Sequence, residues 1–208
     1  MSCAKCKVKS CYFSGEILES CPLSEQLLKE AVKEYLKPLI SRIYLAAAEV
    51  EKRAYSQNKH GLKPVKPRVL ELMEFLKICG FKKVGIAFCI GLSSEAERLT
   101  KVLEENGFEV FSVVCKCGGV DKEELEIPEE FKLRGGRETA CNPILQAKIL
   151  NEYGTDVNII VGLCIGHDML FTMYSRAPVT TFIVKDRLTG HNPAVALYSS
   201  YYKNYLKL

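Results

Sequence analysis

Apolar residues in the N-terminal third of the chain recur at the spacing of an amphipathic helix. The stretch that follows Ser24, a residue type that often caps helices, repeats leucine, alanine and tyrosine at intervals of about four. Pro38 is expected to interrupt this helix and to start a second helical stretch, which would end near residues 60–61. The KPVKP sequence at residues 63–67 then predicts a linker.

From residue 67 onward, apolar runs alternate with amphipathic stretches. The runs rich in Val, Ile and Phe predict strands at residues 82–89, 108–115, 157–164 and 178–186, and the stretches between them predict helices at 67–80, 93–107 and 142–154. Nearly continuous apolar strands separated by helices are typical of a parallel sheet covered on both faces. The sequence therefore predicts an α/β fold with an open, mostly parallel, Rossmann-like sheet and helices on both faces.

We expect this domain to occupy residues 63–208. A helical segment at 24–62 precedes it, and a cysteine-rich metal-binding head at 1–23 begins the chain. Residues 117–141 form a long predicted loop inside the α/β domain, and loops of this length are usually functional or mobile.

Composition narrows the functional classes. The 29 Lys and Arg against 25 Asp and Glu give a net charge of +4, too small to indicate nucleic-acid binding. No apolar run approaches the roughly 20 residues of a membrane span, and the N-terminus lacks the apolar core of a secretory signal. We therefore expect a cytoplasmic protein without membrane contact. The sequence gives no signal for an oligomeric state.

The ten cysteines then need an explanation other than disulfides, because cytoplasmic thiols are kept reduced. Metal binding or thiol chemistry is favoured for those that cluster. Four of them lie in the head with the spacing C-x2-C-x4-C-x9-C: Cys3, Cys6, Cys11 and Cys21. Four thiolates suit tetrahedral zinc or an iron–sulfur cluster. The alternatives are a disordered thiol-rich start, or a site that uses only two or three of them.

A second set of cysteines follows the predicted strands or precedes a predicted helix: Cys89, Cys115, Cys117, Cys141 and Cys164. In an open parallel sheet, ligands bind beyond the carboxyl ends of the strands. These thiols are therefore predicted to converge on one metal or cluster, and either Cys115 or Cys117 could be the ligand from its segment. The alternative is that each packs singly as a small apolar side chain, which is the interpretation we give to Cys79.

Polar residues that could share this site follow the third and fourth predicted strands. His167, Asp168, Lys185 and His191 are the candidate catalytic residues, and Lys185, Arg187 and His191 could surround an anionic substrate. A helix cap is the alternative for Asp168, and a solvated turn is the alternative for the segment around His191.

The sequence resembles bacterial and archaeal cysteine-rich proteins that are classed as a domain of unknown function and described as metal-binding. The resemblance rests on CAKCKVKSC, GIAFCIGL, VVCKCGGVDKEEL, ETACNPILQAKILNEYGTDVNIIVGLCIGHD and APVTTFIVKDRLTGHNP. It implies metal at Cys3, Cys6 and Cys11. It also implies that functional residues lie in the other segments: Cys89, Cys115, Cys141, Cys164, His167, Asp168, Lys185, Asp186, Arg187 and His191.

Three functional hypotheses follow. The first is an iron–sulfur protein, with a four-iron cluster favoured, whose strand-end site acts on a small anionic or sulfur-containing molecule. The second is a non-catalytic zinc, metal-carrier or electron-transfer protein. The third is a thiol redox enzyme that uses Cys115 and Cys117 without metal. The sequence does not decide whether the protein is an enzyme. It lacks the G-x-G-x-x-G pattern of dinucleotide sites.

Overall fold

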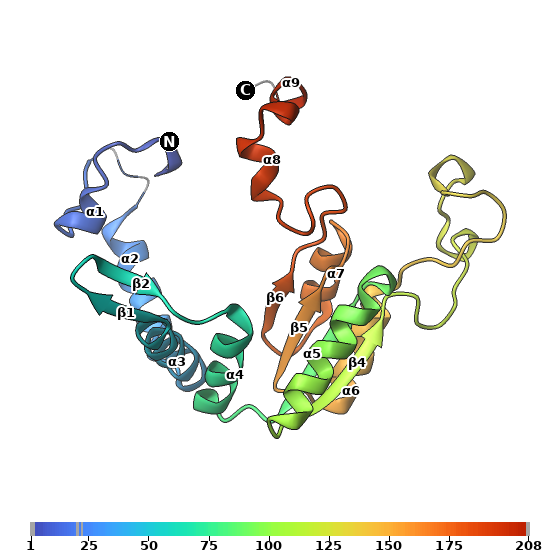
Figure 1. Cartoon of the computed structure of the whole chain (residues 1–208), viewed down its shortest axis with the longest axis horizontal. Helices are drawn as coiled ribbons and strands as arrows, with labels where there is room; N and C mark the ends of the chain where they lie inside the picture. The colour runs from blue at the N-terminus through green and yellow to red at the C-terminus, as the bar shows by residue number, and fades with distance from the viewer. Residues whose placement is uncertain (1–2, 20, 22, 207–208) are drawn as a thin grey trace. The chain divides into compact units, whose positions relative to one another are not determined.

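The computed structural model describes residues 3–19, 21 and 23–206 (Figure 1). Within this part the chain divides into two compact units, Met1–Val65 and Lys66–Leu208. The helices described for these residues include none that is both long enough and apolar enough to span a bilayer.

The first unit is mainly helical. Its helices and strands are α1 (Ser10–Phe13), α2 (Glu25–Glu34), α3 (Pro38–Ala54), β1 (Tyr55–Asn58) and β2 (Gly61–Pro64). The Ser24 hydroxyl accepts a hydrogen bond from the Leu27 amide at 3.1 Å, which caps α2. Pro38 occupies the first turn of α3, where its missing amide costs nothing. The predicted cap and the predicted break at Pro38 are therefore confirmed.

The prediction that helix continues to residues 60–61 is wrong. The helix α3 ends at Ala54, and β1 and β2 form an antiparallel hairpin across residues assigned above to helix and linker. The turn explains the difference, because the Asn58 side chain accepts the His60 amide at 2.8 Å and Gly61 has a φ of 104°. His60 is thus a turn residue and not a helix terminus.

The second unit contains the parallel sheet. In its described residues, β3 (Lys83–Phe88), β4 (Glu109–Val114), β5 (Val157–Val161) and β6 (Val179–Ile183) lie in the order β4-β3-β5-β6, and every neighbouring pair is parallel. The helices of this unit are α4 (Arg68–Cys79), α5 (Ser93–Glu105), α6 (Pro143–Tyr153), α7 (His167–Tyr174), α8 (Ala194–Tyr198) and α9 (Lys203–Leu206). The prediction of an α/β fold with a parallel sheet flanked by helices is confirmed.

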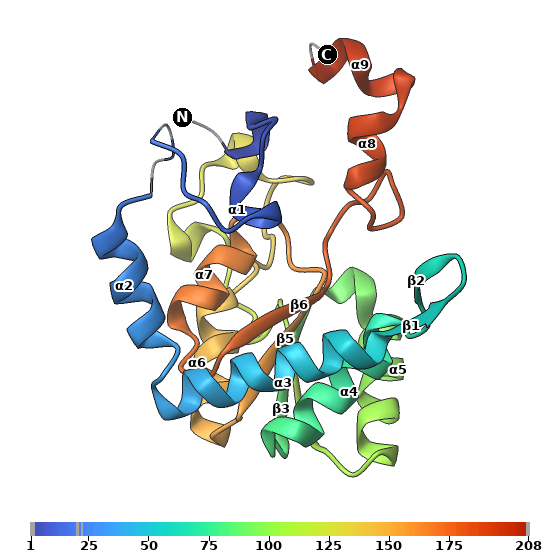
Figure 2. The same cartoon turned by 90° about the vertical axis from the view of Figure 1, so that its left-hand side faces the viewer.

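The strand order places the crossover helices on opposite faces. The connection from β3 to β4 runs one way along the sheet, and the connections to β5 and β6 run the other way. Because such crossovers are right-handed, α5 covers one face and α6 and α7 cover the other. Figure 2 shows α6 and α7 on one side of the strands and α5 on the other. All three helices therefore begin at the carboxyl edge of the sheet.

The core of the second unit contains a buried polar network around Asn158. Asn158 on β5 is fully buried; its side chain accepts from the Thr155 hydroxyl and donates to the Ser175 hydroxyl, each at 2.8 Å. Gly85 on the neighbouring β3 has to lack a side chain, because a Cβ there would lie 2.0 Å from the Asn158 amide oxygen. A central strand thus contains a glycine for a packing reason.

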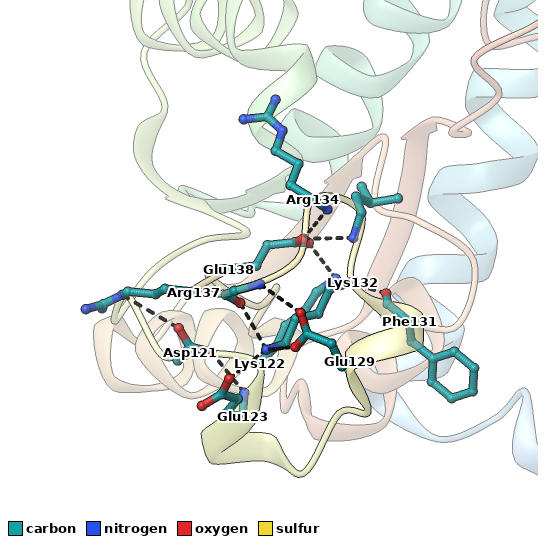
Figure 3. A network of polar contacts seen from close by, with 11 residues as sticks. Asp121, Lys122, Glu123, Glu129, Phe131, Lys132, Arg134, Arg137 and Glu138 are labelled. Carbon is teal, nitrogen blue, oxygen red and sulfur yellow. Dashed lines mark hydrogen bonds and ion pairs between the residues drawn. The ribbon is translucent and has the colours of Figure 1, made fainter.

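The long predicted loop is held together by ion pairs around a buried lysine (Figure 3). The side chain of Lys132 is 1% exposed and lies 2.7 Å from the Glu123 carboxylate and 2.6 Å from that of Glu129. Lys122 pairs with Glu138 at 2.5 Å, and the same carboxylate accepts the Leu133 amide at 2.8 Å. The segment therefore has an ordered structure of its own between Cys117 and Cys141.

Candidate functional site

The sheet brings four cysteines to its carboxyl edge. Cys89 follows β3 directly, Cys115 follows β4 directly, and Cys164 lies just after β5. Cys141 lies at the end of the long loop, next to Asn142, whose side chain caps α6 by accepting the Leu145 amide at 3.0 Å. Since the strands are parallel, these four segments end at the same side of the fold.

The sulfurs of Cys89, Cys115 and Cys141 form a chain of contacts. The Cys115 thiol donates a hydrogen bond to the Cys141 sulfur, and the Cys89 side chain hydrogen-bonds to Cys115. The Ile90 amide also donates to the Cys115 sulfur at 3.3 Å. The backbones are joined as well, because the Asn142 amide donates to the Cys115 carbonyl at 2.7 Å. Cys89 and Cys141, each 26 residues from Cys115 in the sequence, thus both contact it.

These contacts give Cys115 and Cys141 different pKa values. The hydrogen bond from Cys115 lowers the pKa of Cys141 to about 7; burial opposes this shift and the charge of Lys116 assists it. The same hydrogen bond, followed by burial, raises the pKa of Cys115 well above its ordinary range. Cys141 is therefore substantially thiolate at neutral pH, while Cys115 keeps its proton.

Two cationic side chains from the segment after β6 contact the sulfurs of Cys89 and Cys164. The Lys185 ammonium lies 3.1 Å from the Cys89 sulfur, and the Arg187 guanidinium lies 3.1 Å from the Cys164 sulfur. Each of these cysteines begins a Cys-Ile-Gly sequence. At Gly91 a Cβ would lie 3.3 Å from the Lys185 nitrogen, so the glycine leaves room for the lysine. The two similar turns therefore receive one cation each.

Cys117 takes a different direction from Cys115. Its thiol lies 3.8 Å from the Asn142 carbonyl oxygen, to which it donates. Burial raises its pKa. Of the two cysteines in this segment, Cys115 is the one that contacts the other strand-end sulfurs.

The polar candidates flank this cluster in different ways. His167 begins α7, and its amide donates to the Cys164 carbonyl at 2.9 Å; the amide of Asp168 donates to the same oxygen at 3.1 Å. The ring of His191 closes a turn, because its Nδ1 accepts the Asp186 amide at 3.1 Å. Hydrogen bonds from Thr189 and then from Leu188 lower the pKa of Asp186. The segment that carries Lys185 and Arg187 is thus shaped by an Asp186–His191 turn.

Gln146 is a residue of this site that the sequence analysis did not identify. It is fully buried on α6, and its amide nitrogen donates to the carbonyl oxygens of Val113 at 2.7 Å and Phe88 at 3.3 Å. These oxygens lie just before Cys115 and Cys89, so Gln146 fixes both strand ends to the helix. A signal was present, because position 146 lies on the buried stripe of α6 at helical spacing from residues 143 and 150.

The head cysteines are more exposed than those of the sheet. Cys3 and Cys11 are exposed, and Cys6 and Cys21 are half-buried. The Lys9 amide donates to the Cys6 sulfur at 3.4 Å, and this bond, followed by one from Val8, lowers the pKa of Cys6. Across the residues that the structure describes, no three His, Cys, Asp or Glu side chains are arranged as ligands of a single metal ion.

Comparison with known proteins places the chain in a family. A family model described as a protein of unknown function, DUF1847, matches residues 21–182. The chain belongs to the DUF1847 family. It is also 46% identical to the uncharacterised protein MJ0455 of Methanocaldococcus jannaschii over 202 residues, which is 97% of this chain and 96% of that protein. No solved structure matches it.

The DUF1847 match includes some parts of the candidate site and leaves out others. It contains Cys89, Cys115, Cys141 and Cys164, whereas Cys3, Cys6 and Cys11 precede it and Lys185, Arg187 and His191 follow it. Because the description of DUF1847 states no activity, the chemistry of this protein has to be argued from the geometry of its residues.

Proposed function

We propose that the carboxyl edge of the sheet holds an iron–sulfur centre through Cys89, Cys115, Cys141 and Cys164, and that this centre acts on a small anionic or sulfur-containing molecule. The observation that carries the proposal is that four cysteines from four separate segments lie at this edge, with Cys89, Cys115 and Cys141 in contact. A cysteine that only fills space in a core gains nothing from meeting other sulfurs. Convergence of thiols is the arrangement that soft metals require.

The donor set fits such a centre in chemistry and charge. Four thiolates are the usual ligands of a four-iron cluster. Lys185 and Arg187 contact the outer two sulfurs and would offset part of their negative charge. The amide of Ile90 donates to the Cys115 sulfur, a kind of bond that stabilises thiolate ligands and tunes the metal they hold. The proposal rests on these pairwise contacts and not on a preformed single-ion site.

The same residues provide recognition of an anion. Lys185 contacts Cys89, which shortly precedes α5, and Arg187 contacts Cys164, which shortly precedes α7. Helix N-termini favour negative charge. When bound, a cluster held by all four cysteines would supply redox-active iron. His167 and Asp168, at the start of α7, would hold or donate protons beside Cys164.

Metal analysis of the purified full-length chain tests this proposal. The protein is purified without oxygen, and iron, zinc and acid-labile sulfide are measured together with the visible spectrum. We expect iron and sulfide in similar amounts. We expect their loss in Cys89→Ala, Cys141→Ala and Cys164→Ala but not in Cys79→Ala, which alters a buried cysteine on α4. Unchanged iron and sulfide in the three strand-end variants would refute the site.

The second candidate is a non-catalytic zinc or electron-transfer protein, with metal held by the head. The hydrogen bond from the Lys9 amide to the Cys6 sulfur favours this candidate, because backbone donors of this kind stabilise thiolate ligands in C-x2-C turns. Zinc that is bound without acid-labile sulfide, and that is lost in Cys3→Ala and Cys6→Ala, would support this candidate over the first.

A further inference from the structure

We propose that, in the metal-free chain, Cys141 and Cys115 form a redox-active thiol pair that exchanges with small-molecule disulfides, Cys141 being the attacking sulfur and Cys115 the resolving one. The inference goes beyond the proposed metal site and does not rest on it. It also differs from the Cys115–Cys117 pair that the sequence suggested.

The geometry selects these two residues. Their side chains are in direct hydrogen-bond contact, and their backbones are held together by the 2.7 Å bond from the Asn142 amide to the Cys115 carbonyl. A disulfide needs two backbones close enough for the sulfurs to reach each other, and this bond holds them so. Cys117 instead donates toward the Asn142 carbonyl. A disulfide between Cys115 and Cys117, which only one residue separates, would also be strained.

The roles follow from access to solvent. Cys141 is partly exposed, whereas Cys115 is 2% exposed. A reagent from solution therefore meets Cys141 first. Cys89 also contacts Cys115, but Cys89 is 7% exposed and is held by Lys185.

The reaction has two steps that balance. The Cys141 thiolate attacks a disulfide R–S–S–R, the S–S bond breaks, and a mixed disulfide Cys141–S–S–R forms with release of R–S⁻. Cys115 then loses its proton and displaces the second R–S⁻, which leaves with that proton as R–SH. The products are the Cys115–Cys141 disulfide, one R–S⁻ and one R–SH. The small disulfide is thereby reduced and the protein is oxidised.

Peptide mapping tests the pair directly. The full chain is reduced, freed of metal with a chelator, treated with oxidised glutathione without oxygen, and quenched with acid and N-ethylmaleimide. Trypsin cleaves after Lys101, Lys116 and Arg137, so Cys115, Cys117 and Cys141 fall on separate peptides, 102–116, 117–122 and 138–148. We expect 102–116 linked to 138–148 as the main disulfide, and its disappearance on reduction with dithiothreitol.

Two variants assign the roles. In Cys115→Ser, glutathione is expected to stay attached to Cys141, because the resolving thiol is gone. In Cys79→Ala, the linkage is expected to be unchanged. Circular dichroism confirms that each variant is folded, and the mapping of the unaltered chain stands even where a variant is not. A main linkage of 102–116 to 117–122, a linkage to the Cys89 peptide 84–98, or persistent glutathione on the unaltered chain would each overturn the proposal.

Metal analysis separates this inference from the proposed function. If peptide mapping does not find the Cys115–Cys141 disulfide, the iron and sulfide measurements still test the metal site. Absence of metal in the purified protein would equally leave the disulfide result standing.

Discussion

Replacement of Cys115 by alanine should make Cys141 a much weaker acid. The main cause of the low pKa of Cys141, about 7 against an ordinary 9.0, is the hydrogen bond from the Cys115 thiol. Cys115 keeps its proton at neutral pH, because its own pKa is raised, so the substitution removes a hydrogen-bond donor and not a charge. The pKa of Cys141 is therefore expected to move from about 7 toward about 9.

The magnitude follows from this shift. At pH 7 a thiol with a pKa of about 7 is about one-half thiolate, whereas one with a pKa of about 9 is only about one-hundredth thiolate. A more basic thiolate is also more nucleophilic, which with a Brønsted coefficient of about 0.4–0.5 recovers roughly a factor of six to ten. Reaction of Cys141 at pH 7 should consequently slow by about five- to eight-fold.

The assay is alkylation of the reduced, metal-free chain with iodoacetamide between pH 5.5 and pH 10, read by mass spectrometry on peptide 138–148. The midpoint of the rate against pH gives the pKa of Cys141 and is independent of the other nine cysteines. Cys115→Ser serves as the matched control, because a hydroxyl can still donate to the thiolate and should raise the midpoint less than alanine does. A midpoint that is the same in Cys115→Ala and in the unaltered chain would refute the reasoning.

Three further predictions concern the structure around the site. Gly85→Ala should destabilise the second unit by about 2–5 kcal/mol through overpacking and loss of the Asn158 hydrogen bonds, and Asn158→Ala in the same chain should recover part of this loss; urea unfolding followed by circular dichroism measures both. Gln146→Leu should cost about 1–3 kcal/mol, because two strand-end carbonyls lose a donor while the volume is kept; an unfolding midpoint equal to that of the unaltered chain would show that these bonds contribute nothing. Lys132→Met should expose residues 121–138 to proteolysis, because it removes the ion pair with Glu129. Acid should do the same in the unaltered chain, because Lys132 lowers the pKa of Glu129 and the ion pair is lost as pH falls through that lowered value. Protection that persists in both cases would contradict the role of Lys132.

The parallel sheet was predictable because its two central strands, β3 and β5, are largely buried. Each strand is a mostly apolar run, and β3 and β4 begin and end within one residue of the predicted bounds. The third strand was predicted to reach Cys164 but ends at Val161. Gly162 follows with a φ of 65°, and a Cβ there would lie 2.8 Å from Leu92. Hydropathy does not register such a break, because the residues after Gly162 remain apolar.

The meeting of the strand-end cysteines could be anticipated, but their pairing could not. Sequence places Cys89, Cys115 and Cys164 at one edge as soon as the strands are parallel. It does not give the order β4-β3-β5-β6, which decides which strand ends are neighbours. Nor does it show that the long loop returns Cys141 to Cys115. The hairpin after α3 was missed because two strands of four residues carry too little periodicity to outweigh a helical pattern.

The two cations show how much of the site depends on the turn after the last strand. In the strand order, β6 is next to β5 but two strands away from β3. Arg187 reaches Cys164 beside the adjacent strand, whereas Lys185 reaches Cys89 beyond β3, a span of about two strand spacings, or roughly 10 Å. The segment after β6 therefore has to fold back over the end of β5. The bonds between Asp186 and His191 hold it in that path, so the charge at the cysteines is set by a turn that lies outside the strands and outside the DUF1847 match.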